Sequence, residues 1–398
     1  MMTATTNVAM AASRAHRICT VTAAFLQGGA RRRSVDPTGF FCYKIAMTVE
    51  QFLPAFHYGD AVSNAALALD RSLRAQGIES RLVTLTCDEC LQGRAILFAD
   101  YRVDPAAVKV LHFAVPSPLT DFFLEQKGRK ALFYHNITPA RFFVGYSDFF
   151  VRFVSAGREH LQRLSASFDL SLAMSGYSAG ELRALGFSDV RVFPLPADLG
   201  DYSREPSRPF MELLENERKN ILFVGRVIPN KKIEDLVRTV FYYKKYVSPA
   251  IRLIVMGNTR ALPKYFHALA DLAARFYLTS EDVLFTGHLP LDEFLAVYRR
   301  ADVFLSMSEH EGFCLPLLES CLFQLPILAY DAAAVAETMD GTGILFRDKD
   351  PARVAGLVEQ VLENDALNRR LRAQGPARIE RYRRQADAGL LLDWLRQL

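Results

Sequence analysis

The chain has 398 residues, of which 50% are hydrophobic and 23% are charged, and its formal net charge is +4. This balance is typical of a globular protein, and the length favours two domains because single cores stop growing at about 250–300 residues. Membrane-spanning and disulfide-scaffold proteins are excluded, since no apolar run reaches the ~18–20 residues of a span and the chain has only six cysteines.

Basic residues gather at the N-terminus. Residues 1–46 hold six Lys or Arg and one Asp, residues 47–200 hold 15 basic and 16 acidic residues, and residues 201–398 hold 27 of each. The chain from residue 47 onward is therefore close to neutral, which excludes the basic surface of a nucleic-acid-binding protein. The composition of residues 1–46 resembles a transit peptide, but a gene start placed too early is favoured, because Met47 opens a strand-like run. In either case we expect this segment to be disordered or loosely attached.

From Met47 onward, short buried runs alternate with amphipathic runs. We expect strands at 47–53, 81–85, 108–114, 130–134, 170–174 and 190–193, and helices at 65–76, 141–164 and 179–185. This alternation indicates an α/β fold with a parallel sheet between layers of helices. The helix at 141–164 is aromatic and basic, so it fits either a membrane-contacting helix or a core helix. Core packing is favoured because its apolar positions share one face.

A second α/β pattern follows a linker. Residues 193–210 contain four prolines among charged residues, which predicts an interdomain linker. Further strands are expected at 220–224, 252–256, 283–286, 303–305, 326–329 and 343–346, and helices at 233–242, 291–299 and from 351 onward. We therefore predict two Rossmann-like domains, at 47–200 and 210–385. Neither carries G-x-G-x-x-G, so a dinucleotide fingerprint is absent.

The stretch from Val303 to Ser320 is the strongest candidate site. It predicts a strand, a polar loop and a helix that begins near Phe313. Glu311 and Glu319 bracket the helix start, where free N–H groups favour an anion such as a phosphate. Carboxylates beside such a site suit the hydroxyls of a sugar, although an ordinary first turn with glutamates gives the same spacing.

Two cations follow the first strand of the second domain. Arg226 and Lys231 are close enough in sequence for both to face one anion. Singly, each would be a solvated loop charge, but together with a helix N-terminus they suit a diphosphate. The chemistry that needs them is the departure of a nucleoside diphosphate from a sugar. Charge then builds on the phosphates, and fixed donors there contribute roughly 3–4 kcal/mol each.

Two short motifs could suggest a metal. Cys87 and Cys90 form a C-x-x-C without a second pair or a nearby His, so ordinary thiols are expected. Asp348 and Asp350 resemble the Asp-x-Asp metal motif of another transferase fold. Asp350 directly precedes Pro351 and a helix, so a helix N-cap is expected instead. We therefore expect no metal ion.

Four segments together resemble the retaining glycosyltransferases of family four. They are Ile221–Lys231 (ILFVGRVIPNK), Leu253–Gly257 (LIVMG), Val283–Gly287 (VLFTG) and Ser308–Glu319 (SEHEGFCLPLLE). The resemblance extends from about Met47 to the C-terminus. It implies the GT-B fold, in which two Rossmann-like domains face each other across a cleft and the C-terminal one holds most of the nucleotide sugar. It also implies that a last helix near 386–395 crosses back, so that residues 386–398 return to the first domain.

The resemblance implies a role for each motif position. Glu311 would contact the hydroxyls of the donor sugar and Glu319 the ribose, while Arg226 and Lys231 would hold the diphosphate. His135 would lie near the sugar and the acceptor; taken alone, it also fits a strand-end histidine bonded to the backbone. Further donor-side positions would be Gly59, Gly225, Gly257, His288, Gly312, Phe313, Cys314 and Leu315, and acceptor-side positions would be Asp60, Asn64 and Asn136.

The sequence departs from the family pattern at three places. Cys314 and Lys232 stand where the family often has glycine, and the latter leaves the choice between Lys231 and Lys232 open. The first turn has Gly59-Asp60 in place of a pair of glycines, which leaves its phosphate contact open.

The expected function is metal-independent, retaining transfer of a hexose from a nucleotide sugar to a saccharide or a polyprenol-linked saccharide. No cofactor and no nucleic-acid partner are expected, and the enzyme would work in the cytoplasm, in peripheral contact with the inner face of the membrane. Resemblance to bacterial enzymes of polysaccharide biosynthesis favours GDP-mannose, and hence a mannosyltransferase, over UDP-hexose. Two alternatives remain: a catalytically silent nucleotide-sugar-binding scaffold, and a sugar-nucleotide epimerase or phosphorylase of the same fold.

Overall fold

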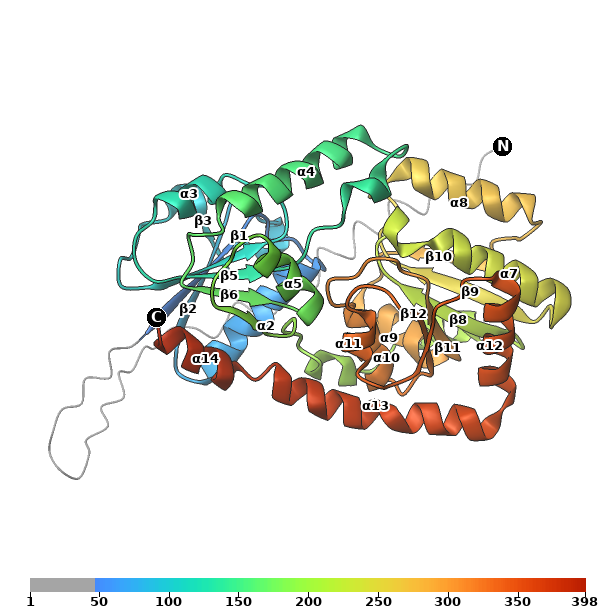
Figure 1. Cartoon of the computed structure of the whole chain (residues 1–398). Helices are drawn as coiled ribbons and strands as arrows, with labels where there is room; N and C mark the ends of the chain where they lie inside the picture. Colours follow the sequence, from blue (N-terminus) through green and yellow to red (C-terminus); the bar gives the residue numbers. More distant parts are fainter. Residues whose placement is uncertain (1–46) are drawn as a thin grey trace, which may run out of the picture.

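The computed structural model describes residues 47–398 (Figure 1). The expectations for residues 1–46, a transit peptide or an extension ahead of the true start, lie outside the described residues. Two parallel sheets lie side by side, which confirms the expected pair of Rossmann-like units.

The first sheet has seven strands in the order β3-β2-β1-β4-β5-β6-β7, with every pair parallel. The strands are β1 (Thr48–Leu53), β2 (Glu79–Thr84), β3 (Ile96–Leu97), β4 (Val108–Phe113), β5 (Lys130–Tyr134), β6 (Leu170–Ala173) and β7 (Val190–Val192). Its helices are α2 (Ala61–Ala75), α3 (Leu119–Glu125), α4 (Asp148–Arg163) and α5 (Gly176–Ala184). All six residues of β4 are buried, as expected for a strand covered on both faces.

The helix predicted for 141–164 is wrong at its start. The structure divides this segment into a 3-10 turn, η3 (Ala140–Phe143), and α4. Gly145 lies between them with a φ of +82°, a conformation outside the right-handed helix. Ser147 then caps α4, because its Oγ accepts a hydrogen bond from Phe150 N. The remainder of α4 packs on the core through Val154 and Leu161, in agreement with the favoured interpretation.

The second sheet has six parallel strands in the order β10-β9-β8-β11-β12-β13. The strands are β8 (Lys219–Val224), β9 (Ile251–Met256), β10 (Val283–Gly287), β11 (Val303–Ser306), β12 (Ile327–Tyr330) and β13 (Ile344–Phe346). The helices are α6 (Arg208–Leu214), α7 (Ile233–Tyr246), α8 (Pro263–Arg275), α9 (Leu291–Arg300), α10 (Leu315–Leu322), α11 (Val335–Met339) and α12 (Pro351–Glu363). Helices α3, α6, α8 and α11 and the short strand β3 were not predicted.

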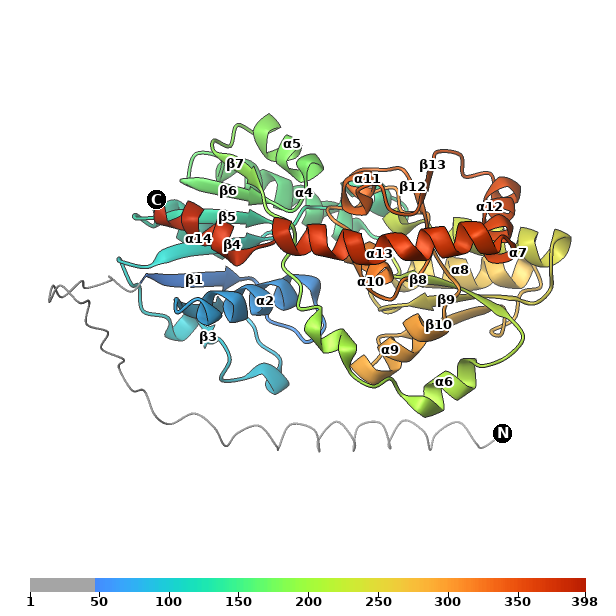
Figure 2. The same cartoon turned by 90° about the horizontal axis from the view of Figure 1, so that it is seen from below.

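The chain crosses between the two sheets twice. The predicted linker leads from β7 through a 3-10 turn, η4 (Gly200–Ser203), into α6. Helix α13 (Asp365–Gln385) then runs along the second unit, and α14 (Ala388–Arg396) lies against α2 of the first (Figures 1 and 2). The Tyr382 hydroxyl donates to Leu195 O at 2.7 Å, and the Trp394 ring lies 6.2 Å from that of Phe193. The expected return of the last helix is confirmed, and we propose 47–200 with 386–398, and 210–385, as the two domains.

No helix between residues 47 and 398 is long and apolar enough to cross a membrane.

Candidate active site

Three glycines meet where β8, β9 and β10 end. Gly225 N donates to Met256 O at 2.9 Å, and Gly257 N donates to Gly287 O at 2.9 Å. A Cβ added to Gly257 would lie 2.1 Å from Gly225 O, so no other residue fits this position without moving the backbone. The carboxyl ends of parallel strands are where open α/β sheets bind ligands. Gly225, Gly257 and Gly287 therefore lie together at the edge of the second sheet where a ligand is expected.

Lys231 and Glu311 lie in direct contact at this edge. Lys231 closes the turn η5 (Pro229–Lys231) after β8, and Glu311 lies in the loop between β11 and α10. The ammonium is 2.7 Å from both carboxylate oxygens. The Glu311 residue is only 7% exposed, so its charge is stabilised by this partner rather than by bulk water.

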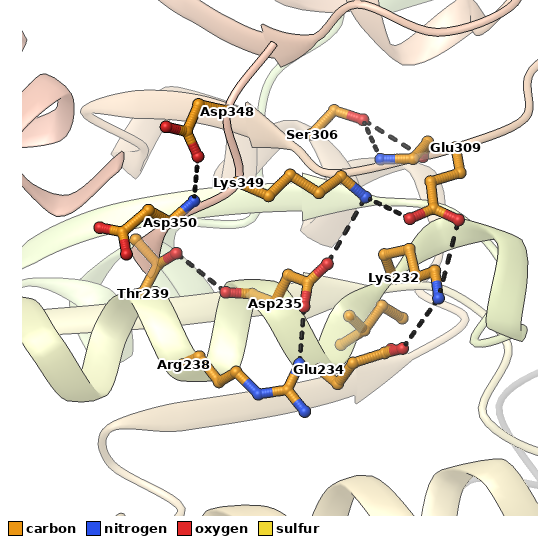
Figure 3. Close-up of polar contacts among 12 residues, drawn as sticks. Lys232, Glu234, Asp235, Arg238, Thr239, Ser306, Glu309, Asp348, Lys349 and Asp350 are labelled. Carbon is orange, nitrogen blue, oxygen red and sulfur yellow. Dashed lines mark hydrogen bonds and ion pairs between the residues drawn. The ribbon is translucent and has the colours of Figure 1, made fainter. Parts of the chain in front are cut away.

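Lys232 belongs to a different group of charges. Its backbone is left-handed, with a φ of +52°, which glycine adopts without strain. Its ammonium pairs with Glu234 at 3.6 Å and with Glu309 at 3.7 Å (Figure 3). Of the two adjacent lysines, Lys231 is therefore the one that reaches Glu311.

Lys349 also contacts the loop between β11 and α10, through Glu309. The Lys349 ammonium is 2.9 Å from Glu309 and 3.5 Å from Asp235 (Figure 3). It also lies 4.3 Å from the centre of the Tyr330 ring. Because Glu309 is two residues before Glu311, these contacts fix the loop that carries the catalytic candidate.

The Asp-x-Asp segment is structural. Asp350 caps α12, since its Oδ1 accepts from Ala352 N and Arg353 N, and Asp348 accepts from Asp350 N (Figure 3). The predicted N-cap is confirmed. Across residues 47–398, no group of three His, Cys, Asp or Glu side chains is arranged to hold a metal ion.

Arg226 follows Gly225 at the end of β8 and is exposed. Within the described part of the chain its guanidinium has no ion-pair partner, unlike Lys231. It is therefore available for an external anion.

Glu319 is buried on α10 and is held by two tyrosines. The Tyr202 hydroxyl donates to Oε1 and the Tyr298 hydroxyl donates to Oε2, each at 2.7 Å. Burial raises the pKa of the Glu319 carboxyl, and the two hydroxyl donors oppose that rise. Sequence reasoning missed both tyrosines, although hydroxyl donors on Glu319 agree with a role in binding hydroxyls.

Helix α10 begins two residues later than predicted. Cys314 is its N-cap, with φ +71° and ψ +68°, and the helix starts at Leu315. Glycine adopts this left-handed backbone readily, so Cys314 keeps the turn that a glycine would form at this position. Burial raises the pKa of the Cys314 thiol well above its usual value, which keeps it uncharged beside Phe313.

The first domain reaches this loop through Asn136. A Cβ added to Gly312 would lie 2.5 Å from the Asn136 Cβ, so the glycine allows a close approach of the two domains. The Ser175 hydroxyl, ahead of α5, donates to Gly312 O at 2.7 Å. His135 precedes Asn136 at the carboxyl end of β5 and is 9% exposed. The structure thus brings the predicted His135–Asn136 pair to the Glu311 loop.

A second interdomain contact joins Gly59 and His288. A Cβ on Gly59, whose φ is +75°, would lie 2.5 Å from the His288 ring. Asp60 is engaged locally, because its carboxylate caps α2 by accepting from Val62 N and Ser63 N. Asn64 is exposed on the first turn of α2.

His310 is a site residue that sequence reasoning missed. It is 3% exposed, and its ring centroid lies 6.1 Å from that of Phe142 and 5.8 Å from that of Tyr177, both in the first domain. Burial lowers its pKa to about 4, and its Nε2 has no partner among residues 47–398. The sequence feature that could have identified His310 as a site residue is its position between Glu309 and Glu311 in the motif.

Residues 206–378 match the family Glycosyl transferases group 1. The chain is 23% identical over 239 residues to a serotype-specific mannosyltransferase, WbdA, of Escherichia coli, which covers 58% of this chain and 29% of that protein. It is 28% identical over 210 residues to a GDP-mannose-dependent alpha-mannosyltransferase of Mycobacterium tuberculosis, covering 50% of each. The chain thus spans half or less of the length of these two curated relatives.

Solved structures with the same architecture include Anabaena HepE in complex with UDP and glucose. The TM-score is 0.64 at 14% identity, over 88% of this chain and 100% of that one. Sucrose-phosphate synthase from Thermosynechococcus elongatus has a TM-score of 0.69 at 16% identity, over 88% and 98%. Identities this low show the fold alone.

Proposed function

We propose that this chain transfers a hexose from a nucleotide sugar to a saccharide acceptor with retention of configuration. The premises are that residues 206–378 belong to the group 1 glycosyl transferases and that the two domains have the GT-B fold. The observation that carries the proposal is the contact between Lys231 and Glu311, at 2.7 Å, beside the strand-end glycines and the start of α10. A cation for phosphates and a carboxylate for sugar hydroxyls meet there in one place.

The two charges change partners when the donor binds. Without a ligand, Lys231 neutralises the buried Glu311 carboxylate, because an unpaired buried charge is costly. When a nucleotide sugar binds, the ammonium moves to the diphosphate and the carboxylate accepts hydrogen bonds from the sugar hydroxyls. Arg226 joins Lys231 on the phosphates as the glycosidic bond breaks and negative charge builds there.

Glu319 binds the ribose. A carboxylate oxygen of Glu319 then accepts a hydrogen bond from a sugar hydroxyl in place of the one from a tyrosine hydroxyl. Gly225, Gly257, Gly312 and the backbone N–H groups of Phe313, Cys314 and Leu315 let the diphosphate and sugar approach the main chain. His288 contacts the base. In this scheme attack comes from the same face as departure, without a protein nucleophile and without a metal ion.

The acceptor binds from the first domain. His135 and Asn136 lie beside the Glu311 loop, and Asp60 and Asn64 lie at the start of α2. The names of the mannosyltransferase relatives favour GDP-mannose over UDP-hexose and a growing polysaccharide as acceptor.

Peripheral contact with the cytoplasmic face of a membrane is part of the proposal. Val144 and Phe149, next to η3 and on α4, are 65% and 62% exposed. Arg141 and Arg152 are exposed on the same segment. Apolar side chains flanked by arginines suit an anionic lipid surface that presents a polyprenol-linked saccharide.

The test combines donor binding with transfer. Thermal unfolding is measured with GDP, UDP and ADP, because a ligand at 100 times its Kd adds about 2.7 kcal/mol of stability. Radiolabelled transfer from GDP-mannose to a saccharide acceptor is then compared between the wild type and Glu311→Ala. Transfer at the parental rate in Glu311→Ala contradicts the site. Binding without transfer to any acceptor identifies the silent scaffold, and product formed without acceptor, or with inorganic phosphate alone, identifies an epimerase or phosphorylase.

A further inference from the structure

A chain of polar side chains crosses the apolar face of the first sheet and ends at His135. Gln51 on β1 and His112 on β4 are both fully buried. His112 Nε2 lies 2.9 Å from Gln51 Oε1, and His112 Nδ1 lies 2.8 Å from His135 Nε2. The strands β1, β4 and β5 are neighbours, so these three side chains form one row across the sheet.

The row lies in an apolar layer. Val49, Val110 and Phe133 each lie two residues before a member of the row, on the same face of the sheet. They belong to an apolar cluster that also contains residues of α2 and α14. Buried polar side chains in such a layer are costly unless they are hydrogen-bonded. The hydrogen bonds between Gln51, His112 and His135 meet this requirement, so the row forms one connected network.

The direction of the hydrogen bonds follows from the glutamine. In the structure the Gln51 amide donates its Nε2–H to Ser80 Oγ at 3.2 Å, and its Oε1 faces His112. An amide oxygen can only accept, so His112 carries its proton on Nε2. Burial lowers the pKa of His112 to about 3, so the ring is neutral and its Nδ1 has no proton. That Nδ1 must then accept from His135 Nε2–H.

The tautomer of His135 follows from that of His112. Burial and the neighbouring His112 keep the pKa of His135 well below its usual value, so it is neutral and its Nδ1 is a bare acceptor. This nitrogen has no hydrogen-bond partner among residues 47–398 and is not sealed from solvent. We propose that Gln51 and His112 are positioning residues that fix His135 as the Nε2–H tautomer, so that its Nδ1 accepts a hydrogen bond from a hydroxyl of a bound sugar.

The sugar as the ligand of His135 rests on the proposed function. The tautomer itself is a property of the free protein. A hydroxyl that donates to His135 keeps its oxygen lone pairs free, which orients it for a second contact or for attack. A histidine in the other tautomer would donate to that oxygen and remove this preference.

The test is ¹⁵N–¹H correlation spectroscopy of the full chain labelled at histidine, with the His135 signals assigned by their loss in His135→Asn. The wild type is expected to show a protonated Nε2 and a bare Nδ1. In Gln51→Leu, which keeps the volume but removes the acceptor, the His112 Nε2–H would be buried without a partner. The proton is then expected on His112 Nδ1, which donates to His135 Nε2. Both histidines would therefore change from the Nε2–H to the Nδ1–H tautomer.

Gln162→Leu makes the same chemical change on the exposed side of α4 and is expected to leave both tautomers unchanged. A wild-type His135 protonated on Nδ1 overturns the proposal, as does a folded Gln51→Leu protein whose two tautomers are unchanged. If Gln51→Leu does not fold, the wild-type spectrum alone decides. In transfer assays, Gln51→Leu is expected to lower kcat/KM by about tenfold, the size of one lost hydrogen bond. If the protein shows the expected spectra but no transferase activity, the proposed function is refuted, whereas the assignment of the His135 tautomer is still supported.

Discussion

The hydroxyl of Tyr202 donates a hydrogen bond to Oε1 of Glu319 across 2.7 Å, although Tyr202 belongs to the segment that links the two domains. The other oxygen of Glu319 accepts from Tyr298, which lies on α9 within the second domain. The two tyrosines therefore differ in origin: one is part of the domain that holds the donor, and the other arrives with the linker. A ribose that binds Glu319 competes with the linker tyrosine.

Tyr202→Phe is expected to strengthen binding of the nucleoside diphosphate. Removing the hydroxyl leaves Oε1 open, so the ribose no longer displaces an internal hydrogen bond worth about 0.5–1.5 kcal/mol, and the Kd is expected to fall by roughly two- to tenfold. The measurement is titration calorimetry. Tyr298→Phe is the matched control and is expected to weaken binding, because it removes the hydroxyl that orients the carboxylate. Equal effects from both variants would contradict this division of roles.

Lys231→Met is expected to reduce transfer far more than Lys232→Met. The first change removes the cation that pairs with Glu311 and that is proposed to meet the diphosphate, and a fixed donor to developing charge contributes roughly 3–4 kcal/mol, or 10²–10³ in kcat. The second removes a lysine that pairs with Glu234 and Glu309 at 3.6 and 3.7 Å. Its expected loss is below about threefold, because partly exposed ion pairs contribute little. Steady-state kinetics on both variants checks the order.

Much of the fold was predictable because its strands are continuous apolar runs. The range predicted for β5, 130–134, is the one observed, and the other strand ends shift by one or two residues. The long helix at 141–164 could not be predicted correctly, since its apolar spacing hides the break at Gly145. Periodicity reports which residues share a face, not where the backbone leaves the helix.

The candidate site was predictable only where it follows the motifs. Glu311, Lys231 and the strand-end glycines come together because parallel strands end at one edge. Tyr202 and His112 could not be predicted, because their partners lie on other elements: Glu319 is 117 residues from Tyr202, and His135 is 23 residues from His112. Such contacts depend on how domains and strands pack, which one sequence does not reveal.

Gly257→Ala is expected to destabilise the second domain. The added Cβ would lie 2.1 Å from Gly225 O and 2.7 Å from Gly225 C. These are backbone atoms, which cannot move aside as a flexible side chain can, so we expect a loss of several kcal/mol, on the order of 3 or more. Gly180→Ala is the control: it lies inside α5 with no atom within 4 Å of the added Cβ, and a gain of about 0.5–1 kcal/mol is expected. Urea unfolding of both variants measures the difference, and a neutral Gly257→Ala would contradict the close approach of the strands.

His310 is expected to make the protein less stable in acid. Burial lowers its pKa from 6.5 to about 4, so below pH 6.5 the unfolded chain binds a proton that the folded chain does not. Stability is therefore lost as the pH falls from 6.5 toward 4, by about 2 kcal/mol between pH 7 and pH 5 for this one group. His310→Gln has no proton to gain, so its free energy of unfolding is expected to fall less over the same interval. Urea unfolding at pH 7, 6 and 5 measures both proteins. Parallel pH profiles would show that His310 is protonated in the folded state, which its contacts with Phe142 and Tyr177 do not favour.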